Sequence, residues 1–330
     1  MKKIAMVFLS IIFSIFIVEG SIRIFGFKPW KNYKTNQTII FESINNLGWK
    51  SKKGIYTVKA GSLNTKSEIT IGERGNRLNQ IRGKSDGKPE IIFIGGSFTQ
   101  GWGVNDNQTF VSKIQNNYKN FKILNFGQGG YGGVQSLILL KDEIKNFKNT
   151  KLIVYGFIEH HQYRNVARSS WLESLARFSS QGYYKEPKVP FATLDKLGNL
   201  EIKKPISYLK LPFREYSSII TLIEKVYMKQ STKSRKKIQY KVTKKIFKDM
   251  NELAKKNNSK YLVVFLDWVN DGTSKNYKKF LLNEKIMFVD CKIDLDDETL
   301  IKGDYHPNEV GHSRYYKCIN SFISEKKLLL

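Results

Sequence analysis

Residues 90–101 read EIIFIGGSFTQG, and this stretch decides the fold. Its first part, Glu90 to Ile94, is an apolar run typical of a strand that is buried on both faces of a parallel sheet. A glycine-rich turn follows, and Ser97 lies within it. A serine in that place can project from the turn with backbone N–H groups nearby. The stretch therefore predicts a parallel sheet with a candidate nucleophile at its carboxyl edge.

Apolar runs and helical patterns alternate along the rest of the chain. Further strands are predicted at residues 122–126, 152–157, 261–266 and 286–290. Apolar residues at helical spacing lie between the strands, as at Phe110, Val111 and Ile114. Pro307 opens a predicted terminal helix over 308–323. This alternation predicts an α/β fold of three layers, with helices on both faces of a central parallel sheet of about five strands.

The N-terminal region has the features of a membrane anchor. Met1-Lys2-Lys3 is a short positive segment, and Ile4 to Val18 is apolar apart from two serines. This pattern is that of a secretory signal or a signal anchor. Since no A-x-A cleavage site follows, we expect residues 1–26 to remain as a transmembrane helix. A single-pass topology would place the rest of the chain outside the cytoplasm.

The chain after the anchor is expected to form one α/β domain with an insertion. Residues 27–88 are polar and turn-rich and are interpreted as a spacer with edge strands. The α/β domain then covers residues 89–330. A basic, irregular stretch at about 163–240 is interpreted as an insertion, with a helix near Ser217 to Met228. Because the insertion follows the third predicted strand, it should begin at the ligand-binding edge of the sheet.

The formal net charge of the chain is +27, and its pI is near 9.8. Such an excess implies attraction to anionic partners, namely nucleic acid, lipid head groups or acidic polysaccharide. Lysine far outnumbers arginine, so a lysine-rich bias of composition explains part of the excess. No zinc-finger spacing, RNP-like motif or heptad-linked basic region occurs, so nucleic acid is not the expected partner.

Neither the cysteines nor the histidines form a recognisable metal motif. Cys291 and Cys318 lack CxxC spacing. They could pair in an oxidising compartment, but two unpaired buried thiols are the interpretation that we favour. The four histidines, taken with Asp304, match no zinc spacing. The loop around Ser97 lacks the glycine and lysine pattern of nucleotide sites, so no metal or other cofactor is expected.

Two later loops supply partners for Ser97. Residues 125–133 read NFGQGGYGG, and five glycines within seven residues indicate unusual backbone angles or close approach to a ligand. Near the end of the chain, Asp304 lies two residues before His306. A carboxylate so placed can fix the tautomer of a histidine and stabilise its charged form. Ser97 could then act as a nucleophile, with His306 as its base and Asp304 as the group that orients the histidine.

These three segments together resemble the SGNH/GDSL hydrolases. Residues 91–99 resemble the first block, with Gly96 in place of the usual Asp of G-D-S, and residues 125–132 resemble the second. Residues 304–308 resemble the last block, although one residue separates Asp304 from His306 where two are commoner. The resemblance covers roughly 88–165 and 240–325. It implies a flavodoxin-like SGNH-hydrolase fold and a triad of Ser97, His306 and Asp304. It also implies an oxyanion hole that includes the N–H groups of Ser97 and Gly130.

The third block of the family departs from its usual pattern. An asparagine normally follows the third strand as an oxyanion donor, whereas this chain has His160 and His161 after Glu159. Ionised Glu159 would repel an oxyanion. Because successive residues alternate faces at a strand end, we expect only one histidine to point at Ser97. His160 is the predicted donor, with Asn165 as an alternative. Otherwise both histidines are structural and two backbone donors suffice.

The resemblance implies an exported esterase that acts on O-acyl groups of a surface polysaccharide or of lipids. The same residues would serve an O-acetyltransferase that acts on cell-surface polysaccharide. A third interpretation is a degenerate member that binds polysaccharide without catalysis. The missing asparagine favours this third interpretation, and the joint retention of Ser97, Asp304 and His306 opposes it.

Overall fold

The computed structural model describes residues 2–33, 40–79, 87–178, 187–267 and 272–329. A parallel sheet of five strands forms its centre, in the order β11-β10-β7-β5-β6. The strands are β5 Glu90–Gly95, β6 Lys122–Gly127, β7 Thr150–Phe157, β10 Lys260–Phe265 and β11 Met287–Asp290. All five predicted strands are confirmed. Their order is that of flavodoxin, so the topological switch point lies between β5 and β7.

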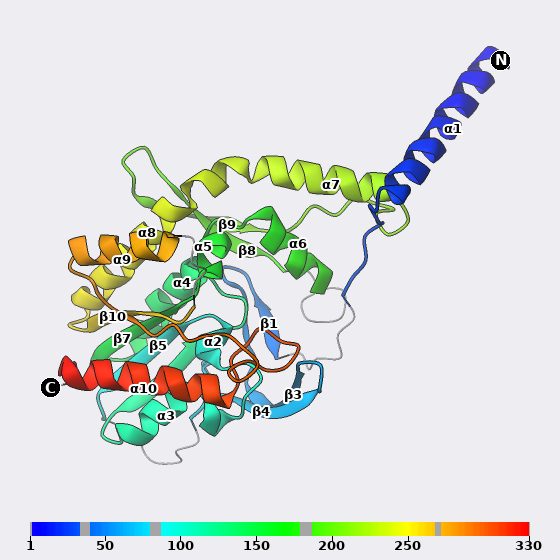
Figure 1. Ribbon diagram of the computed structural model, residues 1–330. Coiled ribbons are helices and arrows are strands. Elements are labelled where there is room, and N and C mark those ends of the chain that lie inside the picture. The colour runs from blue at the N-terminus through cyan, green and yellow to red at the C-terminus, as the bar shows by residue number, and fades with distance from the viewer. Residues whose placement is uncertain (1, 34–39, 80–86, 179–186, 268–271, 330) are drawn as a thin grey trace.

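Helices cover both faces of this sheet (Figure 1). Ile92 and Ile94 of β5 face one core, and Ile91 and Phe93 face the other. Because β5 is buried on both faces, its sequence is apolar at consecutive positions rather than at alternate ones. The helices of the two faces and of the sheet's edges are α2 Ser97–Gln100, α3 Phe110–Asn117, α4 Gly133–Glu143, α8 Lys233–Lys256, α9 Thr273–Asn283 and α10 Glu309–Glu325, with 3-10 turns at Asp106–Gln108 and Ile144–Asn146. The three-layer α/β/α prediction is confirmed.

The region 27–88 was predicted as a spacer with edge strands, and its described residues 40–79 pack against the α/β core. They form two antiparallel pairs, β1 Phe41–Ile44 with β2 Gly48–Ser51 and β3 Gly54–Ala60 with β4 Thr65–Ile71. Trp49 and Ile69 are fully buried in the same apolar cluster as the sheet. This region is therefore part of the domain's core.

The predicted insertion carries elements of its own. They are α5 His160–Asn165, α6 Ser169–Phe178, a hairpin of β8 Val189–Leu194 with β9 Leu200–Ile206, and α7 Ser218–Ser231. The helix predicted near Ser217 to Met228 is α7. Because α5 and α6 directly follow β7, the insertion begins at the carboxyl edge of the sheet, as predicted.

The N-terminal helix α1 Lys2–Ile24 projects away from the rest of the molecule (Figure 1). Residues Lys3–Ile24 are long and apolar enough to cross a membrane, and none of the 18-residue window that meets this test is buried. Within the described ranges no second helix meets the same criterion. The helix is thus a possible membrane anchor, as the sequence predicts.

Cys291 and Cys318 form a disulfide, with their Cα atoms 5.7 Å apart. The interpretation of two unpaired thiols was therefore wrong, because the spacing of 27 residues gave no sign that the end of β11 and the middle of α10 lie side by side. The bond closes the segment that carries Asp304 and His306. Disulfides of this kind persist in oxidising compartments.

Candidate active site

Ser97 begins α2, directly after the turn that ends β5. Gly95 has a φ of +154° there, and a Cβ atom at this position would come within 2.7 Å of the carbonyl oxygen of Gly156. Only glycine fits such a turn. The turn holds Ser97 at the switch point between β5 and β7, where ligands bind in sheets of this topology. The side chain is nearly buried.

The structure brings Ser97, His306 and Asp304 together. Ser97 Oγ lies 2.8 Å from His306 Nε2, and His306 Nδ1 lies 2.5 Å from Asp304 Oδ1. The His306 backbone N–H also donates to Asp304 Oδ1, at 3.1 Å. Two residues that are 209 positions apart in the sequence thus meet in a single hydrogen-bonded chain.

Asp304 is suited to orient a histidine. Burial alone would raise the pKa of Asp304, but the hydrogen bond and the charge of His306 lower that pKa below its ordinary value. Asp304 is therefore ionised at neutral pH. An ionised carboxylate accepts the Nδ1 proton of His306, which leaves Nε2 facing Ser97 as the proton acceptor.

The backbone N–H groups of Ser97 and Gly130 are the oxyanion donors that the sequence predicts. Ser97 is the first residue of α2, so its N–H has no acceptor within the helix. Gly130, at a φ of +79°, lies in the glycine-rich loop after β6. In the part of the chain that the structure describes, neither N–H donates to a protein acceptor. Both are available to a ligand.

His161, rather than His160, is the histidine that faces the nucleophile turn. A Cβ atom on Gly96 would lie 2.7 Å from His161 Nε2, so the imidazole fills the space beside the residue that precedes Ser97. The ring is fully buried, and Nε2 has no hydrogen-bond partner among the described residues. Buried polar atoms without a partner are rare and costly, and they often mark functional positions.

The other ring nitrogen of His161 is engaged. His161 Nδ1 lies 2.8 Å from Tyr155 Oη, and the two rings are stacked. Burial lowers the pKa of His161 well below its usual value, and the positive charges of Arg164 and His160 lower it further, so the imidazole is neutral. Burial also raises the pKa of Tyr155 well above its usual value, so the phenol keeps its proton. When Tyr155 donates to Nδ1, the imidazole proton lies on Nε2.

His160 and Asn165 have different surroundings. His160 is exposed and lines a shallow hollow of about 230 Å³ with Tyr163, Arg164, Ser170, Trp171 and Ser174. Asn165 is buried, and its side chain accepts from the Val134 N–H and donates to Thr243. These bonds give Asn165 a structural role. The geometry therefore favours His161 over the predicted His160 as the third donor.

Two side chains from residues 40–79, Trp49 and Arg77, brace both loops of the site. The Trp49 indole N–H donates to the Gly129 carbonyl oxygen at 2.8 Å, and Tyr131 Oη donates to the Trp49 carbonyl oxygen. Arg77 is fully buried and pairs with Asp106 at 2.8 Å. The Arg77 guanidinium also donates to the carbonyl oxygens of Gln100 and Gly101, at the end of the nucleophile helix. Nothing in the local sequence distinguishes Arg77 within a basic chain.

Replacing Arg77 with leucine should lower the free energy of unfolding by about 3–5 kcal/mol, because it leaves Asp106 buried without its partner. Arg74→Ala is the matched control. Arg74 is half exposed, and its partner Glu143, 3.2 Å away, keeps Lys50 as a second partner at 3.1 Å, so its loss should cost less than about 1 kcal/mol. Urea titration of the detergent-solubilised full chain measures both values. Equal, small losses in the two variants would contradict the bracing role of Arg77.

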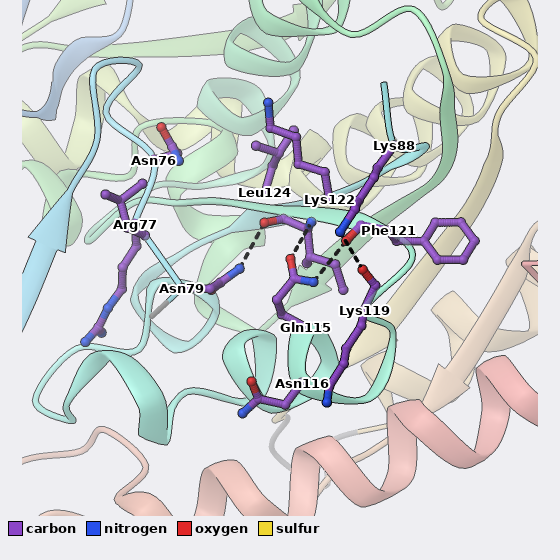
Figure 2. Close-up of a pocket in the computed structure, with 12 residues that line it drawn as sticks. Asn76, Arg77, Asn79, Lys88, Gln115, Asn116, Lys119, Phe121, Lys122 and Leu124 are labelled. Atoms are coloured by element: carbon purple, nitrogen blue, oxygen red, sulfur yellow. Dashed lines mark hydrogen bonds between the residues drawn. The ribbon is translucent and has the colours of Figure 1, made fainter. Parts of the chain in front are cut away.

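A further hollow of about 630 Å³ lies away from Ser97, between α3 and the start of β6 (Figure 2). Asn79 and Gln115 point into it and bond the backbone of β6 at Ile123. This is the amino end of β6, opposite to the carboxyl edge that carries Ser97. The hollow is therefore separate from the candidate site. Within the described ranges, no three His, Cys, Asp or Glu side chains are placed to hold a metal ion.

Several solved structures resemble this chain. TesA is 12% identical, with a TM-score of 0.41, and the match covers 73% of this chain and 99% of TesA. A member of the lipolytic protein G-D-S-L family from Veillonella parvula is also 12% identical, with a TM-score of 0.40. The match covers 71% of this chain and 98% of the Veillonella protein. A family two carbohydrate esterase from Clostridium thermocellum is 11% identical, with a TM-score of 0.42. The match covers 73% of this chain and 65% of the esterase chain.

Two of these neighbours are described as a lipolytic protein of the G-D-S-L family and as a carbohydrate esterase. No family model matches the chain. No curated protein matches it either. At these identities and TM-scores the likeness says nothing about substrate, and the chemistry rests on the geometry around Ser97.

Proposed function

We propose that the chain is a membrane-anchored SGNH/GDSL-type hydrolase that cleaves O-acyl esters by way of Ser97, His306 and Asp304. The observation that carries this proposal is the 2.8 Å contact between Ser97 Oγ and His306 Nε2, with Asp304 behind the imidazole. A serine hydroxyl is a poor nucleophile unless a base takes its proton. The N–H groups of Ser97 and Gly130 have no protein acceptor among the described residues, which supports the same chemistry.

The first half of the reaction forms an acyl-enzyme. Ser97 Oγ attacks the ester carbonyl carbon while His306 Nε2 takes the hydroxyl proton. The carbonyl oxygen becomes an oxyanion, which the N–H groups of Ser97 and Gly130 stabilise. When the tetrahedral intermediate collapses, the ester C–O bond breaks and the leaving alcohol takes the proton from His306. Asp304 stabilises the imidazolium that exists between the two transfers.

The second half releases the acid. A water molecule gives a proton to His306 Nε2 and attacks the acyl carbon. The intermediate then collapses, and Ser97 Oγ leaves and recovers that proton. The acyl group departs as a carboxylic acid, so the net reaction is addition of one water to the ester.

We propose His161 as the third oxyanion donor, in place of the usual asparagine. Its Nε2 lies in the space that a side chain at position 96 would need. The two departures from the family pattern, Gly96 for Asp and His161 for Asn, would then compensate for one another. Tyr155 acts as a positioning residue, because its hydroxyl fixes the tautomer in which Nε2 carries the proton.

The substrate that we propose is the O-acyl group of an exported polysaccharide or of a lipid. The excess of positive charge favours an anionic polymer or surface. The α1 helix and the disulfide favour a site of action outside the cytoplasm, at the membrane.

The full chain in detergent should release nitrophenol from p-nitrophenyl acetate and acetate from an acetylated polysaccharide. Ser97→Ala should do neither. A parallel reaction with an unacetylated sugar acceptor separates hydrolysis from transfer: if acetyl groups appear on the acceptor and little free acetate forms, the transferase alternative replaces the hydrolase. Wild-type turnover equal to that of Ser97→Ala would overturn both.

A further inference from the structure

The end of α1 is joined to the start of α7 by charged and polar contacts. The Glu19 carboxylate accepts from the Ser217 hydroxyl and from the backbone N–H groups of Ser218 and Ile219, at 2.8–3.1 Å. Arg23 donates to the Tyr216 carbonyl oxygen at 2.6 Å. The Glu19 side chain of α1 thus supplies the acceptor that backbone N–H groups in the first turn of α7 lack within their own helix. The start of α7 therefore lies at the same level as Glu19.

The outer face of α7 carries several apolar side chains. The buried residues on the face packed against the protein are Ser218, Thr221, Glu224 and Met228. The outer face carries Ile223, Val226 and Tyr227, which are 52%, 59% and 59% exposed. An amphipathic helix on a soluble surface buries its apolar side. Exposed apolar side chains on the outer face therefore indicate that something apolar covers it.

More exposed apolar side chains surround the junction. Ile24 and Phe25 at the end of α1 are 86% and 80% exposed, and Phe213 and Tyr216 just before α7 are 72% and 76% exposed. Together with Ile223, Val226 and Tyr227 they form what we call the junction surface. The bonds of Glu19 and Arg23 place the start of α7 beside the end of α1, the helix that is apolar enough to cross a membrane.

The length of α1 fixes the depth of this surface. Ile4 to Val18 is 15 residues, or about 22 Å of helix at 1.5 Å per residue, against a hydrocarbon core of about 30 Å. The apolar stretch therefore ends before the bilayer does. The boundary of the hydrocarbon core then falls between Val18 and Ile24. The start of α7 lies at the same boundary, because Glu19 bonds directly to Ser218 and Ile219.

We propose that the junction surface rests in the interfacial layer of the same bilayer that α1 spans, so that the domain is docked on the membrane. This inference rests on the anchoring role of α1 proposed above. Aromatic and aliphatic side chains are favoured at that depth, and basic residues beside them attract anionic head groups. Exposed lysines lie near these residues in the sequence, at Lys28, Lys210, Lys229 and Lys233.

Spin labels on the full chain in lipid nanodiscs test this docking, with the Cys291–Cys318 bond left oxidised. Single variants Ile223→Cys and Val226→Cys report on the junction surface. Leu197→Cys is the matched control, because Leu197 is an apolar residue that is 87% exposed on the β8–β9 turn. Phe13→Cys in α1 is the control for lipid burial. The measured quantity is the accessibility of each label to oxygen relative to a water-soluble nickel chelate.

The oxygen-to-nickel ratio at positions 223 and 226 should be several-fold higher than at 197, and should approach that at 13. Equal ratios at 223, 226 and 197, with 13 still buried in lipid, would overturn the docking and leave the anchor intact. A water-like ratio at position 13 would overturn the anchor and the docking together. Dipolar broadening between labels at 223 in nanodiscs loaded with two chains would show that a second copy covers the face, which also overturns the proposal.

Discussion

Replacing Ser97 with alanine should lower kcat for ester hydrolysis by about 10⁴- to 10⁶-fold, and His306→Ala should have a similar effect. Each change removes the same step, since the hydroxyl attacks only while the imidazole takes its proton. The double variant should therefore be little slower than either single one. Ser43→Ala, at an exposed serine of β1, is the control and should keep wild-type activity. If the losses in kcat of the two single variants multiply in the double variant, Ser97 and His306 do not act in the same step.

His161→Leu should lower kcat by about 10²- to 10³-fold, the usual cost of one lost oxyanion donor, which is about 2.7–4 kcal/mol. The matched control is His160→Leu, at the neighbouring and exposed histidine, which should change kcat little. His161→Gln keeps a side-chain N–H donor and should recover part of the rate. Because the donor acts mainly in the transition state, KM should change much less than kcat.

Tyr155→Phe tests the tautomer that this assignment needs. Without the phenol, the proton of His161 can move to Nδ1, so kcat should fall although His161 is intact. The unfolding midpoint should be compared in every variant, because Tyr155 and His161 are both fully buried. If His160→Leu loses the rate and His161→Leu keeps it, the donor predicted from sequence is correct and the geometric assignment is wrong.

The sheet could be predicted from sequence because its signals are local. Five apolar runs bounded by turns and helical patterns are enough to identify β5, β6, β7, β10 and β11. The position of Ser97 at the carboxyl edge then follows from the topology alone. The contact of Ser97 with His306 required one further assumption, that loops at the same edge converge, and the structure brings the two side chains to 2.8 Å.

The parts that sequence could not predict depend on long-range packing. Arg77 and Trp49 brace the active-site loops from a region that is polar and turn-rich along the chain. Cys291 and Cys318 meet because α10 packs beside β11, which no spacing of cysteines reveals. The choice between the two histidines assumed that their side chains alternate between faces, as they do in a strand. In the structure β7 ends at Phe157 and α5 begins at His160. The helical turn there directs His161, and not His160, toward Gly96.

The most direct test of the central claim is labelling of the full chain with a fluorophosphonate probe, followed by mapping of the modified peptide. A fluorophosphonate reacts only with a serine whose hydroxyl is activated by a base. The probe should modify Ser97 in the wild-type chain, should fail to label Ser97→Ala, and should label His306→Ala far more slowly. Labelling that persists in Ser97→Ala, or a folded wild-type chain that takes no label, would contradict the assignment of Ser97 as the nucleophile.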